Sequence, residues 1–297
     1  MTEHNLKSFL VDKKKLIDDL LPLQIERLKA PENLKESMLY SLNAGGKRIR
    51  PVLLLATLNG FNHGDERGLD VACAIEMIHT YSLIHDDLPA MDDDDTRRGK
   101  PTNHKVYGEA LAILAGDALL TYSFEMISSI MHPQVTAEMK MKLVQQLAQA
   151  TGPEGMVGGQ TADMDGEDKA LTVEQLEYIH NHKTGDLLTF AVVAGAILAE
   201  ASDKDIEYLK KFANQLGLVF QIKDDILDIE GDAKTLGKPV GSDTSNHKST
   251  YPSLLTLEGA KQKLNDHTKR AKEYLSNVTM NTSLLEEITD YIVSRDH

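Results

Sequence analysis

The longest nearly unbroken apolar run in this 297-residue chain extends from Leu187 to Ala199, and only Thr189 interrupts it. Its 13 residues are too few to cross a bilayer, because a membrane-spanning helix needs about 20 apolar residues. A helix that is apolar on every face has to be covered by other elements. The run therefore predicts a buried core helix, and the rest of the chain has to supply the segments that cover it.

The remaining segments have helical rather than strand periodicity. Apolar residues recur at helical spacing, and strict alternation of apolar and polar residues is almost absent. No Pro- or Ser-rich linker divides the chain, so we predict one all-α domain over residues 1–297, a helical bundle. The expected helices cover residues 4–29, 32–44, 52–59, 69–87, 107–131, 135–151, 172–200, 203–231 and much of 251–297.

Composition excludes several classes of function. The net charge is −14, from 32 basic and 46 acidic residues, and the chain lacks Trp, so we expect no nucleic-acid partner. Cys73 is the only cysteine, so an intrachain disulfide is impossible. The N-terminal residues are charged throughout and do not resemble a signal peptide. We therefore expect a cytoplasmic protein without a membrane span.

Two aspartate clusters each follow an apolar, helix-like segment. The first, DDLPAMDDDD at residues 86–95, holds six carboxylates, and the second is DDILD at residues 224–228. In the second cluster, Asp224 and Asp228 share one helix face, with Gln221 one turn earlier. Such a stripe could be an acidic surface, but here it interrupts an otherwise apolar helix. Mg²⁺ binds through one or two carboxylates together with substrate phosphate oxygens, so we expect metal sites.

The first cluster needs a break in its helix. Asp86 and Asp92 are six residues apart, which is not one face of a regular helix. Pro89 removes a donor and its ring clashes with the carbonyl at position 85, so the helix should end or bulge near Leu88. That break would bring Asp92 back toward Asp86. A bound cation would also relieve the repulsion between these carboxylates and the helix dipole.

Basic residues accompany these clusters at helix junctions and directly after the acidic run. Each alone could be an ordinary surface charge, but Arg and Lys also bind phosphate oxygens. Two diphosphates could therefore lie between such cations and the metal-loaded aspartates. The candidates are Lys47, Arg50, Arg97, Arg98, Lys183, Lys238 and Lys248.

The two aspartate motifs resemble those of the trans-isoprenyl diphosphate synthases. GGKRIRP, KTG at residues 183–185, FQIKDD and GKPVGSD also match blocks of this family, in family order, between about residues 43 and 252. The likeness is to the bacterial branch that makes farnesyl diphosphate. It implies an all-α bundle around a deep central cavity, usually a homodimer, and three Mg²⁺ ions, for which Mn²⁺ is a possible substitute.

The resemblance also implies a role for each candidate residue. Asp86, Asp87, Asp92, Asp224 and Asp228 would bind the metal ions. Arg97, Lys183, Thr184, Gln221, Lys238 and Lys248 would act at the allylic diphosphate, and Asp86, Asp92, Arg97, Lys183, Thr184, Gln221 and Lys238 are the expected catalytic residues. Lys47, Arg50, His79 and Arg98 would hold the diphosphate of isopentenyl diphosphate.

The implied reaction is the 1′-4 head-to-tail condensation of isopentenyl diphosphate with dimethylallyl and then geranyl diphosphate. Tyr81, five residues before Asp86, is bulky, and its neighbour Ser82 is small. In the family a large aromatic residue at this place accompanies a C15 product, so we expect (E,E)-farnesyl diphosphate.

Other functions of the same fold stay open. A longer-chain synthase would make geranylgeranyl diphosphate, and a silent subunit of a hetero-oligomeric synthase usually loses one aspartate motif, whereas this chain has both. A terpene cyclase usually carries a second motif of the type Asn/Asp-Asp-x-x-Ser/Thr-x-x-x-Glu, whereas Asp228 and Asp232 occupy the corresponding Ser/Thr and Glu positions here. A non-enzymatic cation-binding protein would not explain the basic residues.

Overall fold

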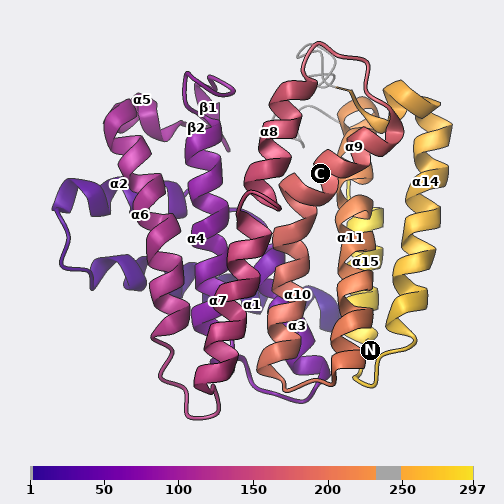
Figure 1. Cartoon of the computed structure of the whole chain (residues 1–297), viewed down its shortest axis with the longest axis horizontal. Coiled ribbons are helices and arrows are strands. Elements are labelled where there is room, and N and C mark those ends of the chain that lie inside the picture. Colours follow the sequence, from indigo (N-terminus) through magenta and orange to yellow (C-terminus); the bar gives the residue numbers. More distant parts are fainter. Residues whose placement is uncertain (1–2, 232–248, 297) are drawn as a thin grey trace. The chain divides into compact units, whose positions relative to one another are not determined.

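The computed structural model describes residues 3–231 and 249–296, and the described chain is almost entirely helical (Figure 1). The prediction of an all-α fold is therefore confirmed. The chain forms two compact units, of which unit 1 comprises Met1–Leu55 and Gly64–Val144 and unit 2 comprises Ala56–His63 and Gln145–His297. Helices α3 (Ile49–Gly60) and α7 (Ala137–Thr151) each contribute residues to both units. That the chain is a single domain stays a prediction.

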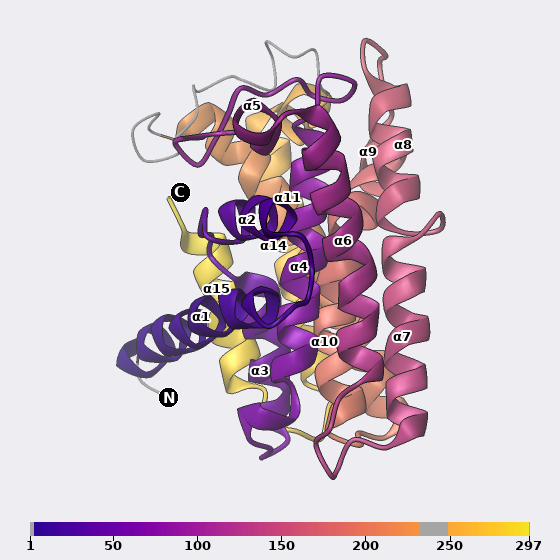
Figure 2. The same cartoon turned by 90° about the vertical axis from the view of Figure 1, so that its left-hand side faces the viewer.

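Unit 1 is organised around α4, which packs against α1, α2 and α6. Figure 2 shows α4 and α6 side by side. The α4 helix buries most of its residues, including Ile75 and Ile78, because helices cover it on several faces. Its neighbours contribute Leu21 and Leu119 to the same core. The helices of this unit are α1 (Glu3–Glu26), α2 (Glu32–Leu42), α4 (Leu69–Asp86), α5 (Asn103–Tyr107) and α6 (Glu109–Ser128), with a 3₁₀ turn at Asp65–Arg67.

Unit 2 is organised around α11, which packs against α9, α10, α14 and α15. The apolar run that predicted a core helix lies in α10, where every residue from Leu187 to Leu198 is buried. That prediction is confirmed. The elements of this unit are α8 (Met156–Gly166), α9 (Val173–His180), a π-helical turn (Asn181–Gly185), α10 (Asp186–Leu198), α11 (Asp203–Glu230), α14 (Tyr251–Leu275) and α15 (Ser283–Ser294).

Three local features differ from the sequence expectations. The helix expected over residues 107–131 is divided at Gly108, whose φ of 82° lies in a region that favours glycine. The helix expected over 172–200 contains a π-helical turn. A two-stranded hairpin, β1 (Thr96–Arg97) with β2 (Lys100–Pro101), was not predicted, because two-residue strands are too short to show alternation.

Helix α6 is only partly covered. Within the described ranges, it is the one helix that is long and apolar enough to cross a membrane, and 39% of that stretch is buried. It packs on α4 and α2 through Ala112, Ala115 and Leu119, whereas Ile113 and Leu114 are exposed. A core helix of a soluble protein meets the same length and composition criteria. The absence of a membrane span therefore stays a prediction.

Candidate functional site

The first aspartate cluster begins where α4 ends. The helix stops at Asp86, and the backbone N–H of Asp92 then donates to the carbonyl of Asp86 at 2.9 Å. Leu88 closes the intervening turn, since its carbonyl accepts from the N–H groups of Met91 and Asp93. The predicted break is confirmed, because the chain returns and places Asp92 beside the last residue of the helix.

Asp87 differs from its neighbours in burial and in its partner. Its side chain is only 5% exposed, whereas Asp92 is exposed. The Nε and Nη2 atoms of Arg97 lie 2.7 and 2.6 Å from Asp87 Oδ1. Burial raises the pKa of Asp87, and the Arg97 guanidinium opposes that rise. This ion pair fixes Arg97 next to the aspartate turn.

The hairpin directs its two arginines to different partners. Arg98 and Gly99 form the two-residue connection with φ values of 54° and 74°, as two consecutive positive values in a tight hairpin turn require. Arg97 reaches back to Asp87, whereas Arg98 donates to the carbonyl of Gly45 and packs over Gly46. A Cβ on Gly46 would lie 3.0 Å from Arg98 Nη2, so glycine permits this close packing.

Cations gather around His79 in unit 1. Burial lowers the pKa of His79 well below its usual value, and the charges of Arg50, Arg98, Arg48 and Arg97 lower it further, in that order. Arg98 reaches solvent, but desolvation and the charge of Arg48 also lower its pKa. Mutual repulsion of this kind favours binding of an anion. The structure therefore brings together three of the four residues expected at the isopentenyl diphosphate site; the fourth, Lys47, is exposed three residues before Arg50.

Tyr81 lies on α4 and is 6% exposed. Its ring packs edge-on against His85, with ring centroids 5.6 Å apart. The Nε2 atom of His85 lies 3.1 Å from the carbonyl of Ile113 on α6, and Gly116 leaves room for the imidazole ring. Tyr81 is thus held by a packed neighbour. The half-buried Ser82 donates to the carbonyl of His79.

The second aspartate cluster lies on a helix that continues past it. Asp224, Asp225 and Asp228 all belong to α11, as predicted. Asp224 is 44% exposed and accepts from Arg295 Nη2 at 2.6 Å. Asp225 is buried and accepts the backbone N–H of Tyr251, the first residue of α14. Asp228 is 2% exposed. Among the three carboxylates, that of Asp224 is thus the most accessible.

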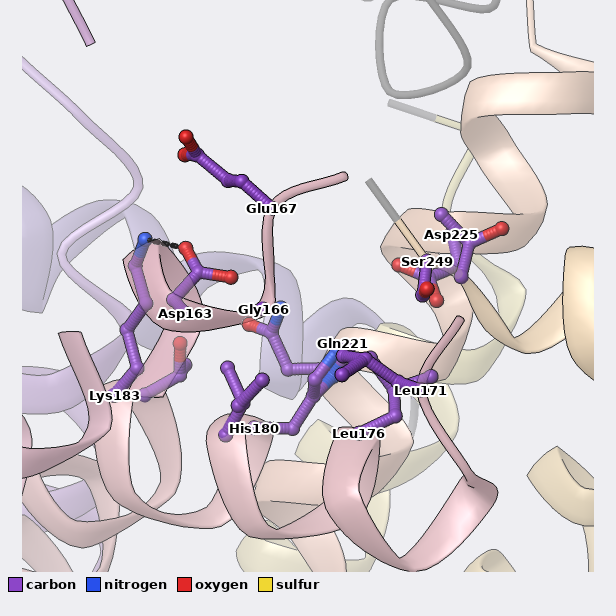
Figure 3. A pocket seen from close by; sticks show the side chains of 13 residues that line it. Asp163, Gly166, Glu167, Leu171, Leu176, His180, Lys183, Gln221, Asp225 and Ser249 are labelled. Carbon is purple, nitrogen blue, oxygen red and sulfur yellow. Dashed lines mark hydrogen bonds and ion pairs between the residues drawn. The ribbon is translucent and has the colours of Figure 1, made fainter. Parts of the chain in front are cut away.

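A pocket of about 160 Å³ in unit 2 connects this cluster to Lys183 (Figure 3). Lys183, Thr184, Gln221 and Asp225 all line it. The Nζ atom of Lys183 lies 2.5 Å from Asp163 Oδ2 on α8, as the dashed line in Figure 3 marks. Three residues expected at the allylic diphosphate therefore share one cavity.

The π-helical turn presents Lys183 and Thr184 to this pocket. π-helical turns are rare and occur frequently at functional sites. Glycines on two neighbouring helices permit this one, since a Cβ on Gly159 would lie 2.1 Å from Lys183 N, and one on Gly217 would lie 3.0 Å from Gly185 Cα. The helices of unit 2 are therefore in backbone contact at the turn that carries two candidate residues.

The donor set suits a hard divalent cation. Across residues 3–231 and 249–296, no group of three or more Asp, Glu, His or Cys side chains is close enough to hold a metal alone. Mg²⁺ does not need such a cage, because it keeps waters and takes phosphate oxygens from its substrate. The exposed Asp92, the half-buried Asp86 and the accessible Asp224 offer oxygen ligands of this kind. Lys238 and Lys248 lie outside the described residues.

Residues 31–292 match the family model described as polyprenyl synthetase. The chain belongs to this family. It is 57% identical over 294 residues to the farnesyl diphosphate synthase of Bacillus subtilis, covering 99% of each chain. It is 54% identical over 297 residues to that of Geobacillus stearothermophilus, covering 100% of each. The crystal structure of an FPP/GFPP synthase from Zymomonas mobilis superposes with a TM-score of 0.86 at 36% identity, covering 99% of this chain and 100% of that one.

Several residues that contact the family motifs were not predicted from the sequence. Asp163 contacts Lys183, and Arg295, two residues from the C-terminus, contacts Asp224. Neither could be found from spacing, because 20 and 71 residues separate the partners. Arg48 belongs to the GGKRIRP motif, but the sequence alone does not predict a role for it. Its side chain is 3% exposed and pairs with Asp18 and Glu76.

Proposed function

We propose that the chain is a farnesyl diphosphate synthase, which condenses isopentenyl diphosphate with dimethylallyl and then geranyl diphosphate. The observation that carries this function is the return turn at Leu88, which places Asp92 beside Asp86 directly before the Arg97–Arg98 hairpin. Carboxylates followed at once by two arginines with different partners suit a metal-bound diphosphate next to a second anion. Full-length identity to farnesyl diphosphate synthases supports the same function.

In this reaction Asp86, Asp92 and Asp224 would hold Mg²⁺ ions, with Asp87 and Asp228 behind them. Mg²⁺, or Mn²⁺ in its place, supplies positive charge that stabilises the departing diphosphate. Three ions is the number expected from the family. The burial of Asp87 and its ion pair with Arg97 support a second task for this carboxylate, which is to orient Arg97.

The basic residues divide between the two diphosphates. Arg97, Lys183 and, outside the described residues, Lys238 and Lys248 stabilise the allylic diphosphate as its C–O bond breaks. Thr184 and Gln221 lie in the same pocket as Lys183 and face the developing allylic cation. Lys47, Arg50, His79 and Arg98 hold the second diphosphate, for which the crowding of cations around His79 is the supporting observation.

The proposed condensation breaks and forms bonds in the following order. The allylic C1–O bond breaks, and the C3–C4 double bond of isopentenyl diphosphate attacks C1 of the resulting cation. A proton then leaves C2 of the former isopentenyl unit, and the released diphosphate takes it up. The buried Tyr81, braced by His85, limits the product to C15. The active form is a homodimer in the cytoplasm, as is usual for the family.

The test is incubation of the purified protein with Mg²⁺, isopentenyl diphosphate and dimethylallyl diphosphate, followed by chain-length analysis. We expect a C15 diphosphate and one inorganic diphosphate for each bond formed. A parallel reaction with EDTA should yield neither. A C20 main product would make the chain a geranylgeranyl diphosphate synthase, and the absence of any condensation product would refute the activity.

A further inference from the structure

Arg48 is buried at the centre of a hydrogen-bond network in unit 1. Its Nε donates to Asp18 Oδ1 at 2.8 Å, its Nη1 to Glu76 Oε2 at 2.6 Å and its Nη2 to the carbonyl of Leu42 at 2.8 Å. Arg48 and Glu76 are each 3% exposed, so this pair is removed from water. The guanidinium thereby joins α1, the end of α2 and α4 at one point.

Arg48 also has an uncommon backbone conformation. Arg48 has a φ of 52°, a left-handed conformation that is uncommon for residues other than glycine. Its carbonyl accepts the N–H of Val52 at 3.1 Å, which makes Arg48 the residue from which α3 begins. Lys47 lies immediately before it and Arg50 in the first turn after it. A shift of the Arg48 side chain would therefore move both cations.

The partner on α4 ties the anchor to the rest of the anion site. Glu76 and His79 are three residues apart on one helix and so lie on neighbouring positions of one face. The charge of Arg48 contributes to the lowered pKa of both His79 and Arg98, so it lies within electrostatic range of both. The network is thus adjacent in sequence to Lys47 and Arg50, and its arginine lies within electrostatic range of His79 and Arg98.

We infer that Arg48 is a positioning residue for the second diphosphate. Its side chain is held by Glu76 and Asp18, and it thereby fixes the positions of its chain neighbours Lys47 and Arg50 without touching the substrate. This inference rests on the proposed function. Stability alone is a weak explanation for the network, because a buried ion pair is often no more stabilising than apolar residues of similar volume. The network holds Arg48 in a strained backbone conformation directly before α3, the helix that carries Arg50. A role in setting the position of that helix explains the network better.

Arg48→Lys tests the inference, because lysine keeps the charge but cannot direct three donors in the guanidinium plane. We expect its KM for isopentenyl diphosphate to rise roughly 10- to 100-fold, while kcat and the KM for dimethylallyl diphosphate change by less than about threefold. Calorimetric titration of isopentenyl diphosphate in the absence of allylic substrate should show the same loss of affinity. Glu76→Gln provides a second variant, which removes the negative charge of the partner and nearly keeps its shape. It should also raise the KM for isopentenyl diphosphate and lower the affinity measured by titration.

Arg67→Lys is the matched control. Arg67 is also a buried arginine of unit 1, 3% exposed, and its Nη2 donates to the carbonyl of Gln134. This variant should lose thermal stability but keep the wild-type KM. The inference is overturned if Arg48→Lys and Glu76→Gln behave like Arg67→Lys, or if the KM values of both substrates rise together. Failure of the wild-type protein to make any prenyl product would instead overturn the proposed function, and that assay precedes the variants.

Discussion

The first aspartate cluster lies on a chain that leaves its helix, whereas the second lies on a helix that continues past it. In the first cluster a proline turn places Asp92 beside Asp86 through a backbone hydrogen bond. In the second, helical spacing alone aligns Asp224 with Asp228 on α11. The same residue type is thus presented by two different backbones, and the neighbours that hold the carboxylates differ accordingly.

The neighbours differ in their distance along the sequence. Asp87 is paired with Arg97, only 10 residues away, so the first cluster is held by its own segment. Asp224 is paired with Arg295, 71 residues away, and Asp225 with the backbone of Tyr251, 26 residues away. We infer that the geometry of the first cluster is largely local, and that the second depends on how the C-terminal helices of unit 2 are assembled.

The largest expected effect is on catalysis, at one proposed metal ligand of each cluster. Asp86→Asn and Asp224→Asn should each lower kcat by roughly 10²- to 10³-fold, because each removes one charged ligand that would stabilise the departing diphosphate. Steady-state kinetics with saturating Mg²⁺ would measure the loss.

Asp93→Asn is the control for that measurement. Asp93 is exposed in the same acidic run and has a φ of 50°, a conformation that asparagine also tolerates. We expect its kcat to remain within about twofold of wild type, because exposed charges of this kind are largely screened by solvent. A loss as large as that of Asp86→Asn would mean that the acidic run acts as one unit, and the division of roles between its residues would be wrong.

The next effect is on product length, for which the first cluster supplies the candidate residue, Tyr81. Tyr81 is buried on α4, five residues before Asp86. Tyr81→Ala should remove the ring that we propose as the limit on chain length and shift the main product from C15 to C20 or longer. Tyr81→Phe keeps the ring and should still release C15. Chain-length analysis of both variants decides this, and unchanged C15 output from Tyr81→Ala would exclude Tyr81 as the limit.

This contrast also explains which parts of the molecule could be predicted from the sequence. The helices, the core run in α10 and the break at Leu88 follow from periodicity and from Pro89, which act over a few residues. The contact of Lys183 with Asp163 and that of Asp224 with Arg295 depend on how helices pack, which spacing does not encode. The π-helical turn could not be predicted either, because it depends on close packing against Gly159 and Gly217 of other helices.

The third prediction concerns pH, because a buried histidine lines the pocket of the second cluster. His180 lines the pocket of unit 2, packs edge-on against Tyr251, and has a pKa lowered by burial to about 4. The unfolded chain would bind this proton near pH 6.5, so the free energy of unfolding should fall as the pH drops from about 6.5 to about 4, by roughly a few kcal/mol. Above that window, His180 should contribute no pH dependence.

Urea unfolding at several pH values would measure this dependence in the wild type and in His180→Asn. Carboxylates also titrate at the lower end of this range, so the difference between the two profiles is the quantity to compare. The wild type should lose more stability than His180→Asn between pH 6.5 and 4. Parallel profiles would show that His180 is not held in its neutral form.

The smallest expected effect distinguishes Asp225 from Asp224 and Asp228, the proposed metal ligands of the second cluster. Asp225 accepts the N–H of Tyr251 at 2.8 Å, one of the N–H groups that the first turn of α14 leaves without an intrahelical partner. Asp225→Ala should lower the free energy of unfolding by about 1 kcal/mol, the usual loss for a helix-terminal acceptor. Asp225→Asn keeps an oxygen in the same place and should lose less.

The matching change in the first cluster, Asp87→Ala, should lower activity more than stability, the opposite of what we expect for Asp225→Ala. Asp87→Ala releases Arg97, whose side chain is 32% exposed and can be solvated, so activity should fall more than stability. Thermal unfolding and kcat measured on both alanine variants test this directly. If Asp225→Ala loses activity without losing stability, Asp225 belongs with Asp224 as a ligand, and burial would then be a poor guide to which carboxylates of a cluster bind metal.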